Sequence, residues 1–146
     1  MRQAHISHND VIHYTHEIIR QIILDEFKPQ AVVTLVKGGL VVGNYLSQYF
    51  DVPLIALNKN YDVYELPDHN EILVADDIND TGATFNKLEL DFVKVGLTLQ
   101  KRKYAALIDN QASSFSIDYY GKLINKEDDN AWIVFPWEEW WKIKNL

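Results

Sequence analysis

The sequence predicts an α/β fold with a mainly parallel, twisted sheet flanked by helices. Two observations indicate this class. Short runs of apolar, often β-branched residues alternate along the chain with longer segments of helical periodicity. The apolar runs are nearly unbroken, which is typical of strands that helices cover on both faces. In such folds, ligands bind at the carboxyl ends of the strands.

The first helix is predicted over Asp10–Phe27, where apolar residues recur at helical spacing. Ser7 and Asn9 precede it as candidate caps, and Pro29 ends it. The next segment, Ala31–Val36, is short and nearly unbroken in its β-branched and apolar residues. It predicts a buried strand of a parallel sheet.

The middle of the chain continues this alternation. Leu40–Phe50 has helical spacing, Val52–Leu57 predicts a second strand and Ile72–Ala75 predicts a third. Between the two strands lies Asn58–Asn70, which is polar and lacks obvious periodicity. A loop of this length is either a lid that closes over a ligand or a plain insertion, and both interpretations stay open here.

One helix and two strands are predicted in the last part of the chain. Helical periodicity resumes over Thr84–Val95 and stops at Gly96, a natural helix end. Tyr104–Ile108 and Trp132–Phe135 predict the fourth and fifth strands. Two charged runs are interpreted as solvated turns, Gln100–Lys103 and Lys126–Asp129.

Length and composition are those of one globular domain, residues 1–146. The chain is 47% hydrophobic and 24% charged, enough for a core, and shows no repeat or linker. The net charge of −7 argues against a broad surface for nucleic acid. The apolar runs are too short to span a bilayer, and no cysteine is present. We expect a cytoplasmic protein that binds neither nucleic acid nor membrane.

The segment Ile72–Phe85 carries the clearest chemical signal. An apolar strand ends in two adjacent acids, Asp76 and Asp77, whose side chains point in opposite directions. A third acid, Asp80, precedes the small and hydroxylic residues Thr81–Thr84, which open the next helix. Small residues let backbone N–H groups approach a phosphate, and the positive helix N-terminus favours it. The plain alternative is an ordinary polar turn.

Taken whole, this segment resembles the phosphoribosyl diphosphate motif of the type I phosphoribosyltransferases, and every position of that motif is filled. The resemblance implies that Asp76 and Asp77 hold the ribose 2′- and 3′-hydroxyls, directly or through Mg²⁺. It implies that Asp80 is the catalytic residue and faces the base near N7. The residues implied to bind the 5′-phosphate of phosphoribosyl diphosphate are Thr81, Gly82, Ala83 and Thr84.

A second match lies one strand and helix upstream. Lys37, Gly38 and Gly39 resemble the loop with which this family holds the diphosphate. Glycine permits the backbone conformation that such a close approach requires. Alone, this tripeptide is a common turn, and its position before the acidic motif is what supports the match.

The third match is at the end of the chain. Asp118-Tyr119-Tyr120 and Ala131–Glu138 resemble the end of bacterial and archaeal xanthine and hypoxanthine-guanine phosphoribosyltransferases. The resemblance implies a small C-terminal hood in which Trp132 stacks on the purine and the backbone of Ile133 contacts its 2-position. The other tryptophans are interpreted as closing the core or an oligomer interface, namely Trp137, Trp140 and Trp141.

One residue departs from the family. A lysine that recognises the purine 6-oxo group is replaced by Asn110, the third base-binding candidate. An amide both donates and accepts hydrogen bonds, whereas an ammonium group only donates. The choice between 6-oxopurines and other bases therefore stays open.

The resemblance implies an enzyme of purine salvage. It would transfer the 5-phosphoribosyl group from phosphoribosyl diphosphate to a purine base, with Mg²⁺ as cofactor, and release diphosphate and a nucleoside 5′-monophosphate. A 6-oxopurine is the first expectation, and adenine or a pyrimidine the alternative. A regulator that binds the same ligands without turnover is the alternative from another class. The resemblance also implies a homo-oligomer, a dimer or tetramer.

Overall fold

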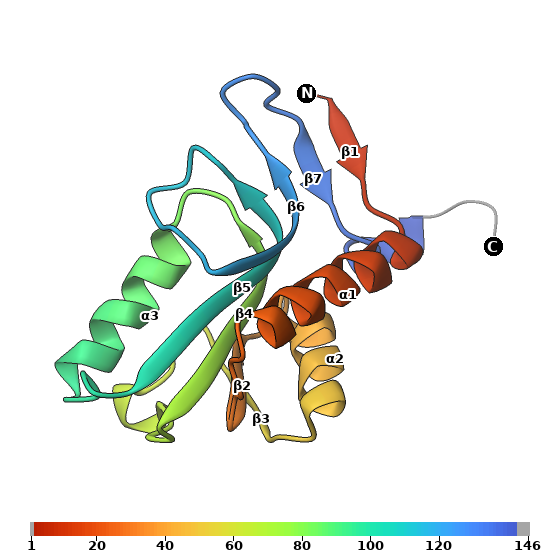
Figure 1. The fold of residues 1–146 in the computed structure, drawn as a ribbon. Helices are drawn as coiled ribbons and strands as arrows, with labels where there is room; N and C mark the ends of the chain where they lie inside the picture. Colours follow the sequence, from red (N-terminus) through yellow and green to blue (C-terminus); the bar gives the residue numbers. More distant parts are fainter. Residues whose placement is uncertain (1, 143–146) are drawn as a thin grey trace.

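Five parallel strands form the central sheet of this computed structural model, which describes residues 2–142 (Figure 1). Their spatial order is β3-β2-β4-β5-β6, and every neighbouring pair is parallel. The mainly parallel sheet is therefore confirmed. The strands are β2 (Ala31–Leu35), β3 (Leu54–Leu57), β4 (Glu71–Asn79), β5 (Lys101–Asn110) and β6 (Tyr119–Ile124).

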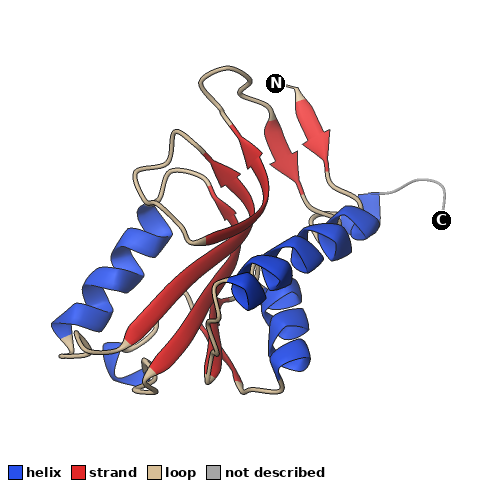
Figure 2. Ribbon diagram, viewed as in Figure 1, coloured by secondary structure: helices blue, strands red, loops and turns tan. Residues whose placement is uncertain are grey.

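Helices cover both faces of this sheet (Figure 2). α1 (His8–Leu24) and α2 (Leu40–Phe50) lie on one face, and α3 (Ala83–Lys94) lies on the other. The side chains of β4 alternate between two buried clusters, one under each helical layer. This double burial explains why the strands are nearly continuous apolar runs. Within residues 2–142, no helix is long and apolar enough to cross a membrane.

The first helix starts two residues before its predicted position, at a reciprocal cap. Ser7 Oγ accepts from the Asp10 N–H at 3.0 Å, and Asp10 Oδ2 accepts from the Ser7 N–H at 2.9 Å. This capping box satisfies two of the free N–H groups of the first turn. Of the two candidate caps, Ser7 is the one used.

The fifth predicted strand is present but belongs to a different sheet. β7 (Trp132–Val134) pairs in parallel with an unpredicted N-terminal strand, β1 (Gln3–His5). The place at the edge of the central sheet is taken by β6, which the periodicity did not indicate. The hood therefore consists of both ends of the described chain, which lie side by side in Figure 1. A short 3-10 helix, Trp140–Lys142, follows β7.

The segment Asn58–Asn70 is anchored at several points. Tyr61 and Leu66 are buried in the core beneath α3, on either side of a 3-10 helix, Val63–Glu65. The Gln100 amide donates to the carbonyls of Pro67 and His69 at 2.8 and 2.7 Å. A movement of the whole segment would break these contacts, which favours a packed insertion over a lid.

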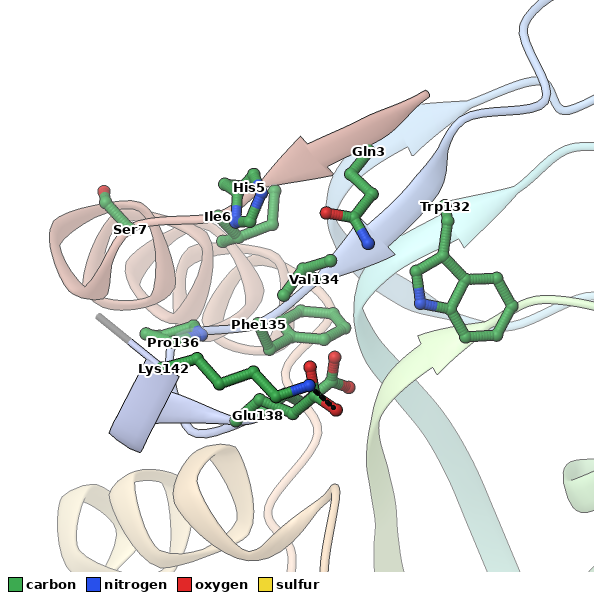
Figure 3. Close-up of a pocket in the computed structure, with 11 residues that line it drawn as sticks. Gln3, His5, Ile6, Ser7, Trp132, Val134, Phe135, Pro136, Glu138 and Lys142 are labelled. Carbon is green, nitrogen blue, oxygen red and sulfur yellow. Dashed lines mark ion pairs between the residues drawn. The ribbon is translucent and has the colours of Figure 1, made fainter. Parts of the chain in front are cut away.

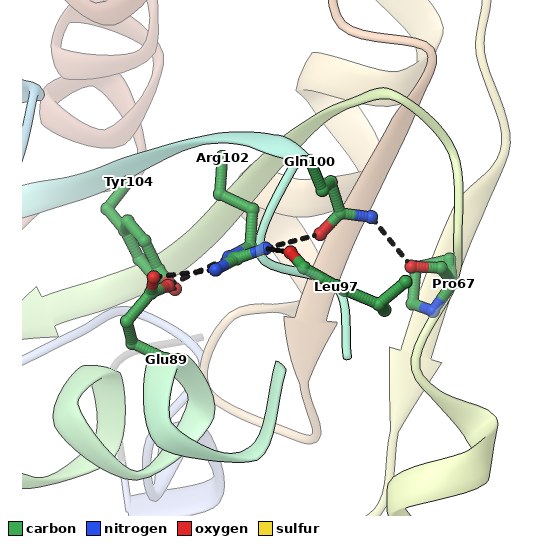
Figure 4. Close-up of polar contacts among 6 residues, drawn as sticks. All are labelled: Pro67, Glu89, Leu97, Gln100, Arg102 and Tyr104. Carbon is green, nitrogen blue, oxygen red and sulfur yellow. Dashed lines mark hydrogen bonds and ion pairs between the residues drawn. The ribbon is translucent and has the colours of Figure 1, made fainter. Parts of the chain in front are cut away.

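A buried arginine joins α3 to β5 (Figure 4). Arg102, only 5% exposed, donates to both carboxylate oxygens of Glu89 at 2.8 and 2.6 Å and to the Leu97 carbonyl at 2.7 Å. Tyr104 also donates to Glu89. The prediction of a solvated turn at Gln100–Lys103 is therefore wrong, because strand β5 begins at Lys101 and Arg102 points inward.

Replacing this carboxylate tests how much the network stabilises the fold. The Arg102 guanidinium lowers the pKa of Glu89 below its usual value of 4.5. A group with a lowered folded-state pKa contributes stability that is lost as the pH falls. We expect Glu89→Gln to lower the Tm by a few degrees at pH 7, whereas Glu65→Gln, at an exposed position, should not. The difference between wild type and Glu89→Gln should shrink below about pH 4.5; a pH-independent difference in calorimetric scans would contradict this account.

Candidate active site

The site lies at the carboxyl ends of the central strands, where ligands of parallel sheets bind. Three of the predicted segments meet there. Lys37–Gly39 follows β2, Asp76 and Asp77 lie in the last part of β4, and Asn110 ends β5. Since β2, β4 and β5 are neighbours in the sheet, their ends are adjacent in space.

Asp76 and Asp77 form a pair of partly buried carboxylates without a counter-ion. Burial raises the pKa of both groups, and the charge of Asp77 raises that of Asp76 further. The Asp77 N–H donates to Asp76 Oδ1 at 2.9 Å. Between residues 2 and 142, no ion pair reaches either carboxylate. Such a pair can accept hydrogen bonds from hydroxyl groups or bind a cation.

The turn Lys37–Gly39 lies directly against these acids. A Cβ atom at Gly38 would lie 2.6 Å from Asp77 Oδ2, and one at Gly39 would lie 1.9 Å from Thr34 Oγ1. The Val36–Lys37 peptide bond is cis. Only glycine leaves room for packing this close. The structure therefore brings the Lys37–Gly39 turn and the acidic segment that begins at Asp76 together, although they are far apart in the sequence.

Residues Thr81–Thr84 form the rim of a small cavity. Its volume is about 220 Å³, and its lining residues are Asp76–Phe85. Gly82 is the N-cap of α3 with a φ of +93°, and Thr81 Oγ1 accepts from the Ala83 N–H at 3.3 Å. The free N–H groups of the first turn of α3 are therefore at this cavity, the arrangement that favours an anion.

The loop after β5 packs against the Thr81–Thr84 segment. Ser114 donates from its N–H and its Oγ to the Thr81 carbonyl at 3.0 and 2.9 Å. Buried Asn79 donates to the Phe115 carbonyl at 2.8 Å. A Cβ atom at Gly82 would lie 2.7 Å from the Phe115 nitrogen. The close packing of the two loops therefore requires glycine at this position for space as well as for its positive φ.

Asn110 lies beside the site, but its amide has partners within the chain. Nδ2 donates to the Asp80 carbonyl at 2.9 Å. Oδ1 accepts from the N–H groups of Ala112 at 3.2 Å and Lys126 at 3.0 Å. The side chain is buried. The amide thus connects three loops through contacts with Asp80, Ala112 and Lys126.

Lys126 is the site residue that the sequence did not indicate. Its Nζ lies 3.0 Å from Asp80 Oδ2 and 5.6 Å from the centroid of the Trp132 ring. The interpretation of Lys126–Asp129 as a solvated turn is wrong at Lys126. No spacing pattern joins Lys126 to Asp80, because the two residues are 46 positions apart and meet only through the fold.

Trp132 faces a cavity of about 860 Å³ between the hood and the C-terminal segment (Figure 3). Its ring is 52% exposed, as a stacking platform requires. Figure 3 shows Trp132 on one side of the cavity and Glu138 on the other. Burial raises the pKa of Glu138, and the charge of Asp77 raises it further.

Ile133 points the opposite way and packs on the core. The Trp132 N–H donates to Arg2, and the Val134 carbonyl accepts from Ile6, both across the pairing with β1. Because backbone groups alternate along a strand, the N–H and C=O of Ile133 point away from β1. The backbone N–H and C=O of Ile133 therefore take no part in the pairing of β7 with β1.

The other tryptophans divide into two kinds. Trp137 stacks on Phe135 at 4.9 Å and packs against the core, as interpreted from the sequence. Trp140 and Trp141 are more than half exposed, so they do not close the core.

Solved structures of other proteins have a similar fold. No protein-family model matches the chain, and no curated protein matches it by sequence. Xanthine-guanine-hypoxanthine phosphoribosyltransferase of Helicobacter pylori matches with a TM-score of 0.79 at 23% identity, over 97% of this chain and 95% of that one. A purine phosphoribosyltransferase of Pyrococcus horikoshii Ot3 matches with a TM-score of 0.73 at 27% identity over 100% of both chains.

A third solved structure is a hypothetical protein of Neisseria gonorrhoeae with bound ppGpp. It matches with a TM-score of 0.71 at 18% identity, over 94% of this chain and 90% of that one. All three share the parallel sheet and its flanking helices over nearly their full lengths. The chain therefore has the type I phosphoribosyltransferase fold, as its motifs implied, and its solved neighbours include bacterial and archaeal purine phosphoribosyltransferases.

Proposed function

We propose that this chain transfers the 5-phosphoribosyl group from phosphoribosyl diphosphate to a purine base, releasing diphosphate and a nucleoside 5′-monophosphate. The observation that carries the proposal is the convergence of its three motifs. The Lys37–Gly39 turn packs against the Asp76–Thr84 segment at the end of the sheet. Trp132, from a third part of the sequence, is linked to this segment through Lys126, which lies between Asp80 and the Trp132 ring. The solved neighbours support an enzyme of this class.

The sugar and phosphates would be bound by local groups. Asp76 and Asp77 offer acceptors for the ribose 2′- and 3′-hydroxyls. The N-terminus of α3 and the hydroxyls of Thr81 and Thr84 would bind the 5′-phosphate. The turn at Lys37 would hold the diphosphate. These donors act at short range, so the net charge of −7 does not oppose the binding of an anionic substrate.

The acidic pair fits a Mg²⁺ ion. Oxygen donors suit this hard cation, and Mg²⁺ is usually bound by one or two carboxylates together with substrate phosphates. Asp76 and Asp77 supply two carboxylates, and a bound cation would offset the repulsion between their charges. When bound, Mg²⁺ would stabilise negative charge on the leaving diphosphate.

Catalysis would depend mainly on positioning. Displacement at the sugar passes through a cationic, oxocarbenium-like state, so the gain comes from alignment and from groups that stabilise the departing diphosphate. Asp80 would face the base near N7 and hold or accept its proton. The hood would help to exclude water, which otherwise hydrolyses the reactive sugar.

A second candidate function is ligand binding without turnover. The neighbour from Neisseria gonorrhoeae with bound ppGpp favours it, because that structure associates the same fold with a bound nucleotide. The presence of an aspartate at position 80, where the resemblance implies the catalytic residue, favours catalysis instead.

Diphosphate release separates these candidates. With phosphoribosyl diphosphate and Mg²⁺, we expect release only when a purine is added, tested with hypoxanthine, guanine, xanthine, adenine, uracil and orotate. Binding of phosphoribosyl diphosphate or nucleotides by calorimetry, with no release for any base, would favour the non-catalytic candidate. Absence of both release and binding would refute the proposal.

Asp80→Asn tests the catalytic group. Loss of a general acid or base typically lowers turnover by about a hundred- to ten-thousandfold. We expect a kcat decrease of this order with little change in the calorimetric affinity for phosphoribosyl diphosphate. Asp68→Asn, at an exposed position of the Asn58–Asn70 segment, is the matched control. Wild-type turnover in Asp80→Asn would rule out this role.

Two glycines test the phosphate loop. Gly82 and Gly96 have similar φ values, +93° and +87°, but only Gly82 has atoms within 4 Å of the place where a Cβ atom would lie. Gly96→Ala should therefore cost only the left-handed strain, about 1–2 kcal/mol. Gly82→Ala should destabilise the fold more and weaken phosphoribosyl diphosphate binding by roughly tenfold or more, about 1.4 kcal/mol. Equal affinities of the two variants would show that this loop does not bind the substrate.

A further inference from the structure

Lys126 has no part in the roles proposed so far. It lies in the turn between β6 and β7, and its side chain is 13% exposed. Its Nζ lies 3.0 Å from Asp80 Oδ2 and 5.6 Å from the Trp132 ring centroid. The ammonium group thus lies between the proposed catalytic carboxylate and the proposed base platform.

The backbone of Lys126 is held in place. Its N–H donates to Asn110 Oδ1 at 3.0 Å, while Asn110 Nδ2 donates to the Asp80 carbonyl at 2.9 Å. One buried amide therefore sets the separation between Lys126 and Asp80. A lysine anchored in this way loses less conformational freedom on binding a ligand than a free surface lysine does.

The side chain still has donors to spare. An ammonium group has three N–H donors and no acceptor. Over residues 2–142, Asp80 is the hydrogen-bond acceptor of Lys126 Nζ. The remaining donors can bind a ligand that stacks on Trp132.

The edge of a purine matches this arrangement. N7 and the 6-substituent lie next to each other on one edge of the base. Since Asp80 is proposed to face N7, the ammonium group at 3.0 Å from its carboxylate is placed to meet the 6-substituent. In guanine this substituent is the acceptor O6, whereas in adenine it is an amino donor. An N–H group of Lys126 can donate to O6 of guanine, whereas the 6-amino group of adenine is itself a donor and cannot accept this bond.

We infer that Lys126 recognises the base, by donating from Nζ to the 6-oxo oxygen of a purine stacked on Trp132. This inference rests on the proposed function and narrows its substrate class to 6-oxopurines. Asn110 then contributes by anchoring Lys126, since both polar atoms of its amide already have partners. Lys126 is a specificity-determining residue that comes from a different loop from Asn110.

A competing role for Lys126 is to neutralise Asp80 without touching the base. That role would affect all bases alike, because Asp80 faces N7, which is an acceptor in both guanine and adenine. A comparison of two bases therefore separates the two roles.

The test compares Lys126→Met, which removes every donor of the side chain, with Lys122→Met, a change at an exposed lysine of β6. For each variant we would measure kcat and KM with hypoxanthine and with adenine, and the calorimetric affinities for inosine and adenosine 5′-monophosphates. A hydrogen bond from a charged donor corresponds to about a ten- to hundredfold change in affinity. We expect Lys126→Met to weaken binding of hypoxanthine and inosine monophosphate by this factor. The affinities for adenosine monophosphate and phosphoribosyl diphosphate and the Tm should change little, and Lys122→Met should match the wild type.

The calorimetric arm keeps this inference separate from the proposed function. If the wild type binds nucleotides without turnover, the catalytic proposal fails. Loss of the inosine preference in Lys126→Met would then still support base recognition by Lys126. An unchanged preference in Lys126→Met, or an equal fall in kcat for both bases, would overturn the inference. A wild type that binds adenosine monophosphate as well as inosine monophosphate would overturn it too.

Discussion

Close contact between two loops at the end of the sheet is the constraint on which the site depends. In the Lys37–Gly39 turn, a Cβ atom at Gly38 would collide with Asp77, and one at Gly39 would collide with Thr34. This contact requires β2 and β4 to be neighbours in the sheet. It places two carboxylates, which no ion pair reaches within residues 2–142, beside the backbone of the Lys37–Gly39 turn.

A second set of contacts links the loops after β4, β5 and β6. Asn110 at the end of β5 holds the backbone of Asp80 on one side and Lys126 on the other. The loop that follows Asn110 supports the phosphate loop through Ser114. Buried polar groups of this kind are stable only when their partners are all present. The position of Asp80 is consequently determined by loops that lie far from it in the sequence.

The elements with strong local patterns were predicted well, and the non-local ones were not. β2, α2 and α3 appear within a residue or so of their expected bounds, because buried apolar runs, periodicity and Gly96 are local signals. The motif residues around Asp76 also form one continuous segment, so the sequence alone could single them out. β7 was expected in the central sheet, but it pairs with β1, and β6 is the edge strand instead. This pairing could not be predicted, because β1 is only three residues long and has no periodicity. Lys126 could not be found either, since its significance lies in contacts with Asp80 and Trp132 that only the fold creates.

The position of Trp132, the proposed base platform, depends on the N-terminal strand β1. β7 is three residues long and belongs to a two-stranded sheet, and such a pair has little stability in isolation. Its backbone is held by Arg2 and Ile6 on either side of β1, while Ile133 attaches it to the core. Hydrogen bonds to the β1 segment on one side and the packing of Ile133 on the core on the other therefore hold the backbone of Trp132, while its ring stays exposed toward the cavity. The hood thus connects the half-exposed Trp132 ring to the core of the central sheet. In the proposed function, a base could stack on this ring while Asp76, Asp77 and the Thr81–Thr84 segment keep their positions.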